Sequence, residues 1–195
     1  MAHNPKIVLA SNSKGRERIL KEAGFDFEIM PSNIDESKIR DANPENLVKL
    51  LARAKAEDIA AKVPEDKIVV GADTICVFGG KVIEKPRDKS DAARMLSAFS
   101  GKTHMIMTGI AVAFRKGKKS LADISIATVT FRKISKSEID DYLKADDALR
   151  FAGGYNIDGT KSMKFIESVC GSYSGIIGMP LEKLIPMLEK CGVGV

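Results

Sequence analysis

The sequence predicts an α/β protein with a mixed β-sheet and flanking helices. Short apolar runs rich in β-branched residues alternate with helical patterns along the 195 residues, as is typical of α/β chains. A Gly-Gly pair at 79–80 separates two short β patterns and predicts a hairpin, which requires antiparallel pairing. Because hairpins and strand–helix crossovers both occur, we expect parallel and antiparallel strands in one sheet.

The strands are predicted from short, largely apolar runs. The first two runs, KIVLA and KIVVGAD, are almost wholly apolar, which indicates strands buried on both faces. TICVF and KVIEK flank the Gly pair as the arms of the hairpin. Two longer β patterns follow, joined by a polar turn at 115–120, and the second alternates between an Ile/Thr face and a Ser/Ala/Val/Phe face. The predicted strands cover residues 6–10, 67–73, 74–78, 81–85, 103–114 and 121–132.

The helices are predicted from helical spacing of apolar residues between start and stop signals. Gly24 is placed to end the first helix, and Asn43-Pro44 is typical of a helix start. Ser135 and Glu138 have the spacing of a capping box. The predicted helices cover residues 14–23, about 45–62, about 89–98, 136–144 and 181–190.

Composition narrows the class of partner. The 31 Lys and Arg against 26 Asp and Glu give a formal charge of +5, a mild excess that favours anionic ligands. Aromatic residues make up 6% of the chain, Trp is absent, and no RNA-binding or zinc-finger pattern occurs. A concave site for a small anion therefore suits the sequence better than a nucleic-acid surface.

The expected location is the cytoplasm. No stretch approaches the roughly 20 apolar residues that cross a bilayer, and the first ten residues lack the apolar run of a secretory signal. The three cysteines, Cys76, Cys170 and Cys191, have no C-x-x-C spacing, so neither a disulfide framework nor a structural zinc site is expected. They are interpreted as buried free thiols.

Two cations lie on the apolar faces of predicted helices. IVLASNSKGR runs from a strand into a helix, where free N–H groups bind anions, and Ser13 is placed to cap that helix. Arg16 precedes Ile19 and Leu20 by three and four residues and so begins the apolar stripe. Lys55 lies within the apolar face of its own predicted helix, four residues after Leu51 and four before Ile59. Each side chain either extends to solvent or grips an anion.

Carboxylates accompany these cations. Asp73 ends a buried strand, where Asp either forms a turn or serves a site at the sheet edge. Asp35 and Glu36 follow another strand, and Lys85 follows the hairpin. Together these charges fit a phosphate chain that carries a divalent cation, although solvated surface charge explains each one separately.

Two Gly-rich segments with interleaved tyrosines lie near the C-terminus. FAGGYNIDG covers residues 151–159 and GSYSGIIGMP covers residues 171–180. Glycines allow a backbone to approach a ligand closely, and Tyr155 or Tyr173 could stack on a flat base. Tight turns in a loop-rich region are the alternative interpretation.

The motifs, in order along the chain, resemble those of the Maf family of nucleoside triphosphate pyrophosphatases. They are LASNS with the following R and IL, DES, A-x-AKA, VVGADTI, GGKVIEKPRD, LSAFSGKTHMIMTGIAV, FAGGYNIDG and GSYSGIIGMPLEKL. The resemblance implies one domain over residues 1–195, with two lobes around a central cleft in an elongated fold similar to that of the inosine triphosphate pyrophosphatases. It also implies hydrolysis of a nucleoside triphosphate to the monophosphate and pyrophosphate with Mg²⁺ or Mn²⁺, and it suggests a homodimer.

The resemblance assigns roles position by position. Asp73 matches the catalytic base, and Arg16, Lys55 and Lys85 match the cations that hold the phosphates. Glu36, with Asp35 as the alternative, matches the acidic residue that holds the metal with Asp73. The positions matched to substrate binding are Ser11, Ser13, Gly15, Thr74 and Asp158.

Two of these positions depart from the family pattern. Gly15 stands where the family usually carries Arg or Trp, and Asp158 stands where the branch acting on dTTP and UTP usually carries Gln. GADT and GGYNIDG still favour that branch. A regulatory protein of cell division, or one that binds nucleic acid and keeps a vestigial pocket, is the alternative.

Overall fold

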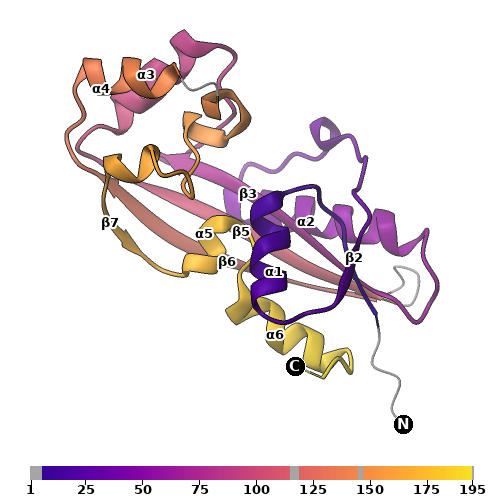
Figure 1. The fold of residues 1–195 in the computed structure, drawn as a ribbon. Helices are drawn as coiled ribbons and strands as arrows, with labels where there is room; N and C mark the ends of the chain where they lie inside the picture. The colour runs from indigo at the N-terminus through magenta and orange to yellow at the C-terminus, as the bar shows by residue number, and fades with distance from the viewer. Residues whose placement is uncertain (1–5, 115–118, 145–146, 195) are drawn as a thin grey trace. The chain divides into compact units, whose positions relative to one another are not determined.

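The computed structural model describes residues 6–114, 119–144 and 147–194 (Figure 1). Within these ranges, seven strands and six α-helices are joined by loops and four short 3₁₀ segments. The strands are β1 (Ile7–Leu9), β2 (Phe27–Ile29), β3 (Ile68–Phe78), β4 (Lys81–Ile83), β5 (Thr103–Phe114), β6 (Lys119–Phe131) and β7 (Ile166–Cys170). The helices are α1 (Lys14–Glu22), α2 (Pro44–Ala60), α3 (Lys89–Phe99), α4 (Lys136–Leu143), α5 (Tyr173–Ile177) and α6 (Leu181–Lys190).

The strands form one mixed sheet in the order β2-β1-β3-β5-β6-β7, with β4 paired to β3. Strand β1 pairs in parallel with both β2 and β3, whereas β4 runs antiparallel to β3 and β7 antiparallel to β6. The predicted α/β class with a mixed sheet and flanking helices is therefore confirmed. No helix among the described residues is long and apolar enough to cross a membrane.

The chain divides into two compact units. Unit 1 comprises Met1–Thr74, Met107–Ser125 and Ser172–Val195, and unit 2 comprises Ile75–Ile106 and Ile126–Gly171. Strands β3, β5 and β6 contribute residues to both.

Unit 1 has a hydrophobic core on each face of its strands. Side chains alternate along a strand, so neighbouring residues of β1 and β3 enter different cores. Helices α1 and α6 cover one face, and α2 covers the other (Figure 1). The first core includes Ile7, Leu9, Ile19, Leu20, Val70, Ala72, Leu184 and Leu188, and the second includes Val8, Ala10, Ala52, Ala56, Ile59 and Val69.

Helix α2 lies unusually close to the sheet because two glycines face it. A Cβ at Gly71 of β3 would meet the backbone oxygen of Ala52 at 2.4 Å, and one at Gly109 of β5 would meet that of Val48 at 2.2 Å. Neither backbone oxygen can move without shifting the helix, so a side chain at either position would displace α2. This close packing fixes the height of the α2 side chains over β3.

The core of unit 2 is aromatic. His104 stacks on Phe99 with ring centroids 4.4 Å apart, and its Nε2 lies 2.6 Å from the hydroxyl of Tyr155. Phe131 packs edge-on against the rings of His104 and Tyr155. Tyr155 is therefore a core residue with 3% exposure, and the structure does not support its stacking on a nucleotide base.

Most element predictions are confirmed at their centres. Five helices, the two long strands and the hairpin lie where the sequence predicts them, and Asn43, Ser135 and Gly24 have the expected capping roles. Two strands were predicted over 67–73 and 74–78, but β3 runs through both as one strand. The predicted turn at 115–120 falls largely outside the described residues.

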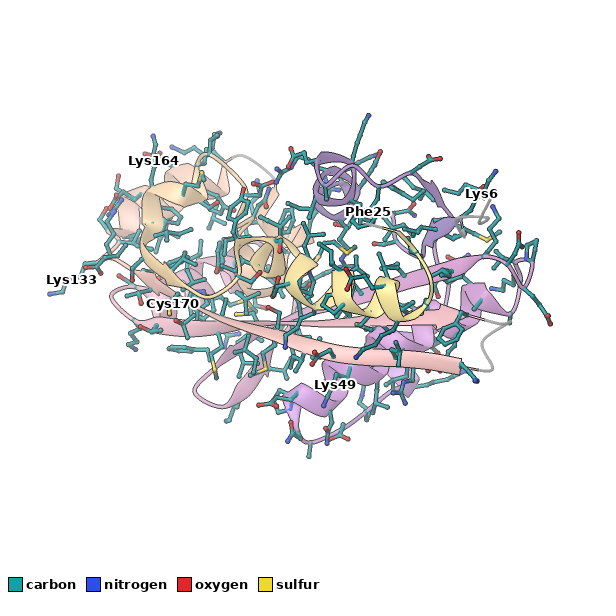
Figure 2. The ribbon with its side chains drawn as sticks, turned by 90° about the horizontal axis from the view of Figure 1, so that it is seen from below. Lys6, Phe25, Lys49, Lys133, Lys164 and Cys170 are labelled. Atoms are coloured by element: carbon teal, nitrogen blue, oxygen red, sulfur yellow. The ribbon has the colours of Figure 1, made fainter. Side chains whose placement is uncertain are left out.

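The prediction of buried thiols is correct for one cysteine. Cys76 is buried, and loss of hydration raises the pKa of its thiol to about 12. Cys170 is exposed on β7, as Figure 2 shows, and Cys191 is partly exposed. Cys170 is exposed because β7 pairs with β6 at one end of the strand order and carries polar residues.

Protonation of His104 should destabilise the fold in mild acid. Burial lowers the pKa of this imidazole from its ordinary value of 6.5 to about 4. Between these two pH values the unfolded chain binds a proton at His104 and the folded chain does not. The free energy of unfolding should fall by about 2 kcal/mol between pH 7 and pH 5. Urea titrations at both pH values measure this drop.

The variant His104→Phe supplies the control. It should be less stable at pH 7 because the Tyr155 hydroxyl loses its partner, but it should lack most of the drop between pH 7 and pH 5. An equal drop in both proteins would assign the pH dependence to other groups.

Candidate functional site

The strand–helix junction after β1 is held by two serines. Ser13 caps α1, because its hydroxyl accepts from the backbone N–H of Arg16. The Ser11 hydroxyl accepts from the backbone N–H of Ser13 at 3.2 Å. Ile19 and Leu20 are buried beneath the helix, which confirms that Arg16 begins its apolar stripe.

The Arg16 guanidinium is fixed by three acceptors from different segments of unit 1. Nε donates to the Gly178 carbonyl at 3.0 Å, and Nη1 donates to the Ser11 hydroxyl at 3.1 Å. Nη2 donates to Thr74 Oγ1 at 3.2 Å. A guanidinium has five N–H donors, so two have no acceptor within the described part of the chain. Arg16 is therefore oriented by the protein and still able to bind an anion.

Loss of hydration lowers the pKa of Arg16 from its ordinary value, and the negative charges of Asp73 and Glu36 offset part of this shift. An arginine nevertheless stays charged at neutral pH. Ser11 accepts from both Arg16 and Ser13, so its own hydrogen is left to donate. The junction therefore presents hydrogen-bond donors of two kinds.

Gly178 is required where it stands. Its φ of 102° lies in the left-handed region, and a Cβ there would meet Thr74 Oγ1 at 2.9 Å and Arg16 Nε at 3.1 Å. The position allows the carbonyl of Gly178 to accept from Arg16 at the end of α5.

Thr108 belongs to the hydrogen-bond network of Thr74, although the sequence does not single it out. The Thr74 hydroxyl lies 2.9 Å from that of Thr108, which donates to the Gly175 carbonyl at 2.8 Å. Thr108 lies on β5 with 0% exposure. Its one signal in the sequence is a hydroxyl within the otherwise apolar run MIMTGIAVAF, and hydroxyls are common in strands.

A second cluster joins Lys55, Asp73 and Glu36. The Lys55 ammonium lies 2.5 Å from Asp73 Oδ1 and 2.8 Å from Glu36 Oε1. Lys55 and Asp73 are largely buried, with side chains 12% and 11% exposed, whereas Glu36 is 55% exposed. Lys55 thus does more than extend to solvent, because two carboxylates from different segments converge on it. Within the described ranges, no group of three or more His, Cys, Asp or Glu side chains is placed to hold a metal.

Both clusters lie beside β3 just beyond the end of β1. Leu9 is the last residue of β1 and pairs with Val70, so Asp73 and Thr74 lie past that pairing. Adjacent strand residues point to opposite faces, and accordingly Asp73 meets Lys55 of α2 while Thr74 meets Arg16 of α1. The carboxyl ends of parallel strands are where α/β sheets place their ligands.

The structure brings most of the predicted site residues together in unit 1, but not all of them. Lys85 and Asp158 belong to unit 2, so their meeting with Arg16 stays a prediction. Gly15 lies against α5, where a Cβ would meet Ile177 Cγ2 at 2.9 Å. The space beside Gly15 is therefore filled by Ile177. Asp35 caps the 3₁₀ turn Glu36–Lys38 and thereby helps to place Glu36.

The sequence model of the family described as Maf-like protein matches residues 6–191. The chain belongs to the Maf family. Several relatives of this Maf chain align with it over 184 to 191 residues and carry the name dTTP/UTP pyrophosphatase.

The Maf relatives are similar over almost their whole length. The dTTP/UTP pyrophosphatase of Bacillus pumilus is 37% identical over 96% of this chain and 97% of its own. The protein of Clostridium novyi is 37% identical, with 97% of this chain and 100% of the relative covered. The protein of Photorhabdus laumondii is 38% identical, with 94% of this chain and 93% of the relative covered.

Two solved structures share a distant likeness with this Maf chain. The dITP/XTP pyrophosphatase of Mycobacterium abscessus has a TM-score of 0.43 and 13% identity, with 95% of this chain and 97% of that chain covered. A HAM1 protein from Coxiella burnetii has a TM-score of 0.49 and 12% identity, with coverage of 95% and 98%.

Replacing Arg16 by Lys should destabilise unit 1. An ammonium cannot reach Gly178, Ser11 and Thr74 in the geometry of the guanidinium fork, so acceptors lose their donor. The free energy of unfolding in urea should fall by about 1–3 kcal/mol. The matched control is Arg18→Lys on the same helix, where the exposed pair with Glu22 should contribute less than about 0.5 kcal/mol. Equal losses in the two variants would contradict the anchoring role of Arg16.

Proposed function

We propose that this Maf-family chain hydrolyses nucleoside triphosphates to the monophosphate and pyrophosphate, with dTTP and UTP as the expected substrates. The names of its relatives support the reaction class. The observation that carries the proposal is the Arg16 guanidinium, which is fixed on three sides and retains two N–H donors beside a cluster of two carboxylates and a lysine.

The phosphates bind at the start of α1. Arg16 grips two phosphate oxygens with its remaining donors, as a guanidinium does in bidentate contacts. The Ser11 hydroxyl donates to a third oxygen, and the first N–H groups of α1 point toward the same charge. Lys55 and Lys85 add positive charge along the phosphate chain, Lys85 from unit 2.

Glu36 and Asp73 are the residues that would hold Mg²⁺ or Mn²⁺. Their fit rests on geometry, since their oxygens already converge on one cation, the Lys55 ammonium. Mg²⁺ is commonly bound by one or two carboxylates together with substrate phosphates. When bound, the metal would neutralise phosphate charge and polarise the phosphorus centre.

Asp73 acts as the general base. Its Oδ1 is bonded to Lys55, and its carboxylate lies beyond the end of β1, where the phosphates bind. It accepts a proton from the water that attacks the α-phosphorus. The new bond joins that oxygen to phosphorus, and the bond to the oxygen that bridges the α- and β-phosphates breaks. Pyrophosphate leaves with its charge stabilised by Arg16, Lys55 and Lys85.

The selection among nucleobases is proposed to depend on the residues that lie beside α1. Thr74 is an indirect contributor, because its hydroxyl is bonded to Arg16 and Thr108. Ile177 occupies the space beside Gly15, where the family usually carries a large side chain. Ile177 therefore takes over the steric role of the missing side chain.

Product analysis tests the proposed reaction. The purified chain, incubated with a panel of nucleoside triphosphates and Mg²⁺ or Mn²⁺, should release equal amounts of monophosphate and pyrophosphate, fastest from dTTP and UTP. Asp73→Asn should lower kcat at least about 10²-fold because the base is lost. The control Asp141→Asn removes an exposed Asp paired with Lys144 on α4, and it should leave the rate unchanged. Release of orthophosphate alone, or full activity of Asp73→Asn, would refute the mechanism.

Removing Lys55 should strengthen metal binding to the protein without nucleotide. The ammonium lies on both carboxylates that would bind the metal, so it competes for them electrostatically. Lys55→Met should bind Mn²⁺ at least about fivefold more tightly, as followed by the electron paramagnetic resonance of free Mn²⁺, while turnover falls. Lys62→Met removes an exposed charge near the end of α2 and should leave Mn²⁺ binding unchanged. Weaker Mn²⁺ binding by Lys55→Met would contradict the assignment of Glu36 and Asp73.

A further inference from the structure

We propose that Thr108 is a positioning residue that orients Arg16 through Thr74 and through the segment from Gly175 to Gly178. Its kinetic consequence rests on the proposed pyrophosphatase function, whereas its structural consequence does not. Among the described residues, the Thr108 hydroxyl is hydrogen-bonded to Thr74 and Gly175 and not to the Arg16 guanidinium or the carboxylate cluster, so it acts through its neighbours.

The direction of each hydrogen bond in the chain from Arg16 to Gly175 is determined. A carbonyl oxygen only accepts, so the Thr108 hydroxyl donates its one hydrogen to Gly175. Thr108 can then only accept from Thr74, which must donate to it. Thr74 is left with lone pairs, and a guanidinium N–H only donates, so the bond from Arg16 Nη2 has the matching direction. Thr108 thereby fixes the direction of the Thr74 hydrogen and keeps a Thr74 lone pair turned toward Arg16.

Thr108 also fixes a second partner of Arg16. Gly175 lies in α5, and Gly178, three residues later, offers its carbonyl to Arg16 Nε. The same segment is held by Glu182, which accepts from Ser172 and Ser125 at 2.7 Å each. Two of the three acceptors that hold Arg16 thus depend on the segment or the hydroxyl that Thr108 contacts.

A packing role alone would not require the hydroxyl. Thr108 is fully buried on β5 next to Met107 and Ile110, and valine has nearly the same shape. The variant Thr108→Val would keep the shape but remove one of the two donors to the Gly175 carbonyl, leaving only the Gly178 backbone N–H, and it would leave the Thr74 hydroxyl free to rotate. Thr108→Ser keeps the hydroxyl, so it should restore the function that Thr108→Val loses.

The kinetic test compares these variants with a matched control. Thr108→Val should lower kcat/KM for the best triphosphate about tenfold, and Thr108→Ser should stay within about twofold of wild type. Thr103 is also on β5 and also pairs with a threonine hydroxyl, that of Thr130 at 2.8 Å, so Thr103→Val should leave kcat/KM unchanged. If Thr108→Val does not fold, Thr108→Ala against Thr108→Ser isolates the same hydroxyl.

A double variant separates positioning from general damage. Because the bond from Thr108 to Gly175 remains in Thr74→Val, adding Thr108→Val to that variant should cost less than Thr108→Val costs in the wild type, but not nothing. Independent structural damage would instead multiply the two losses. Multiplied losses, or failure of Thr108→Ser to restore activity, would overturn the proposal.

A spectroscopic readout keeps the proposal testable without turnover. The Nε–H of Arg16 should give a resolved, slowly exchanging ¹H–¹⁵N signal, assigned by its absence in Arg16→Lys. The signal should broaden or exchange faster in Thr108→Val, and stay unchanged in Thr108→Ser and Thr103→Val. If the wild type hydrolyses no triphosphate, the proposed function fails, and this signal alone decides the role of Thr108. An unchanged signal in Thr108→Val would overturn that role.

Discussion

The hydrogen bonds of the Arg16 guanidinium are the interaction on which the site depends. A partly buried cation is costly unless acceptors surround it, and those of Arg16 come from the β1–α1 junction, from β3 and from the end of α5. One side chain therefore joins segments that are up to 162 residues apart in the sequence. The segments in turn aim the guanidinium, so the fold of unit 1 and its capacity to bind an anion have the same physical origin.

Strand β3 explains how two separate polar clusters form in this region. Asp73 and Thr74 are neighbours in sequence but point to opposite faces, so the carboxylate meets Lys55 of α2 while the hydroxyl meets Arg16 of α1. The close approach of α2 over Gly71 sets the position of Lys55. Because β1 ends at Leu9, Asp73 and Thr74 lie beyond the last β1–β3 pair, and the phosphate site that we propose there draws on both clusters.

The sequence predicts what local chemistry determines. Helices with capping residues such as Asn43 and Ser135 were located closely, and apolar-stripe spacing singled out Arg16 and Lys55. Strand β7 was missed because its polar, exposed sequence lacks a β pattern, and Thr108 was missed because its role arises from contacts with residues 34 and 67 positions away. Tyr155 is predicted as a residue that could stack on a nucleobase, but it belongs to the core, because a Gly-rich sequence does not show whether its aromatic residues are buried.

In the proposed mechanism, the charges around β3 direct water to the α-phosphorus of a nucleoside triphosphate. Hydrolysis in H₂¹⁸O, followed by mass spectrometry of both products, tests this claim most directly. Attack at the α-phosphorus places the ¹⁸O in the monophosphate and leaves pyrophosphate unlabelled, which is the result that we predict. Label in the pyrophosphate would mean attack at the β-phosphorus and would contradict the account.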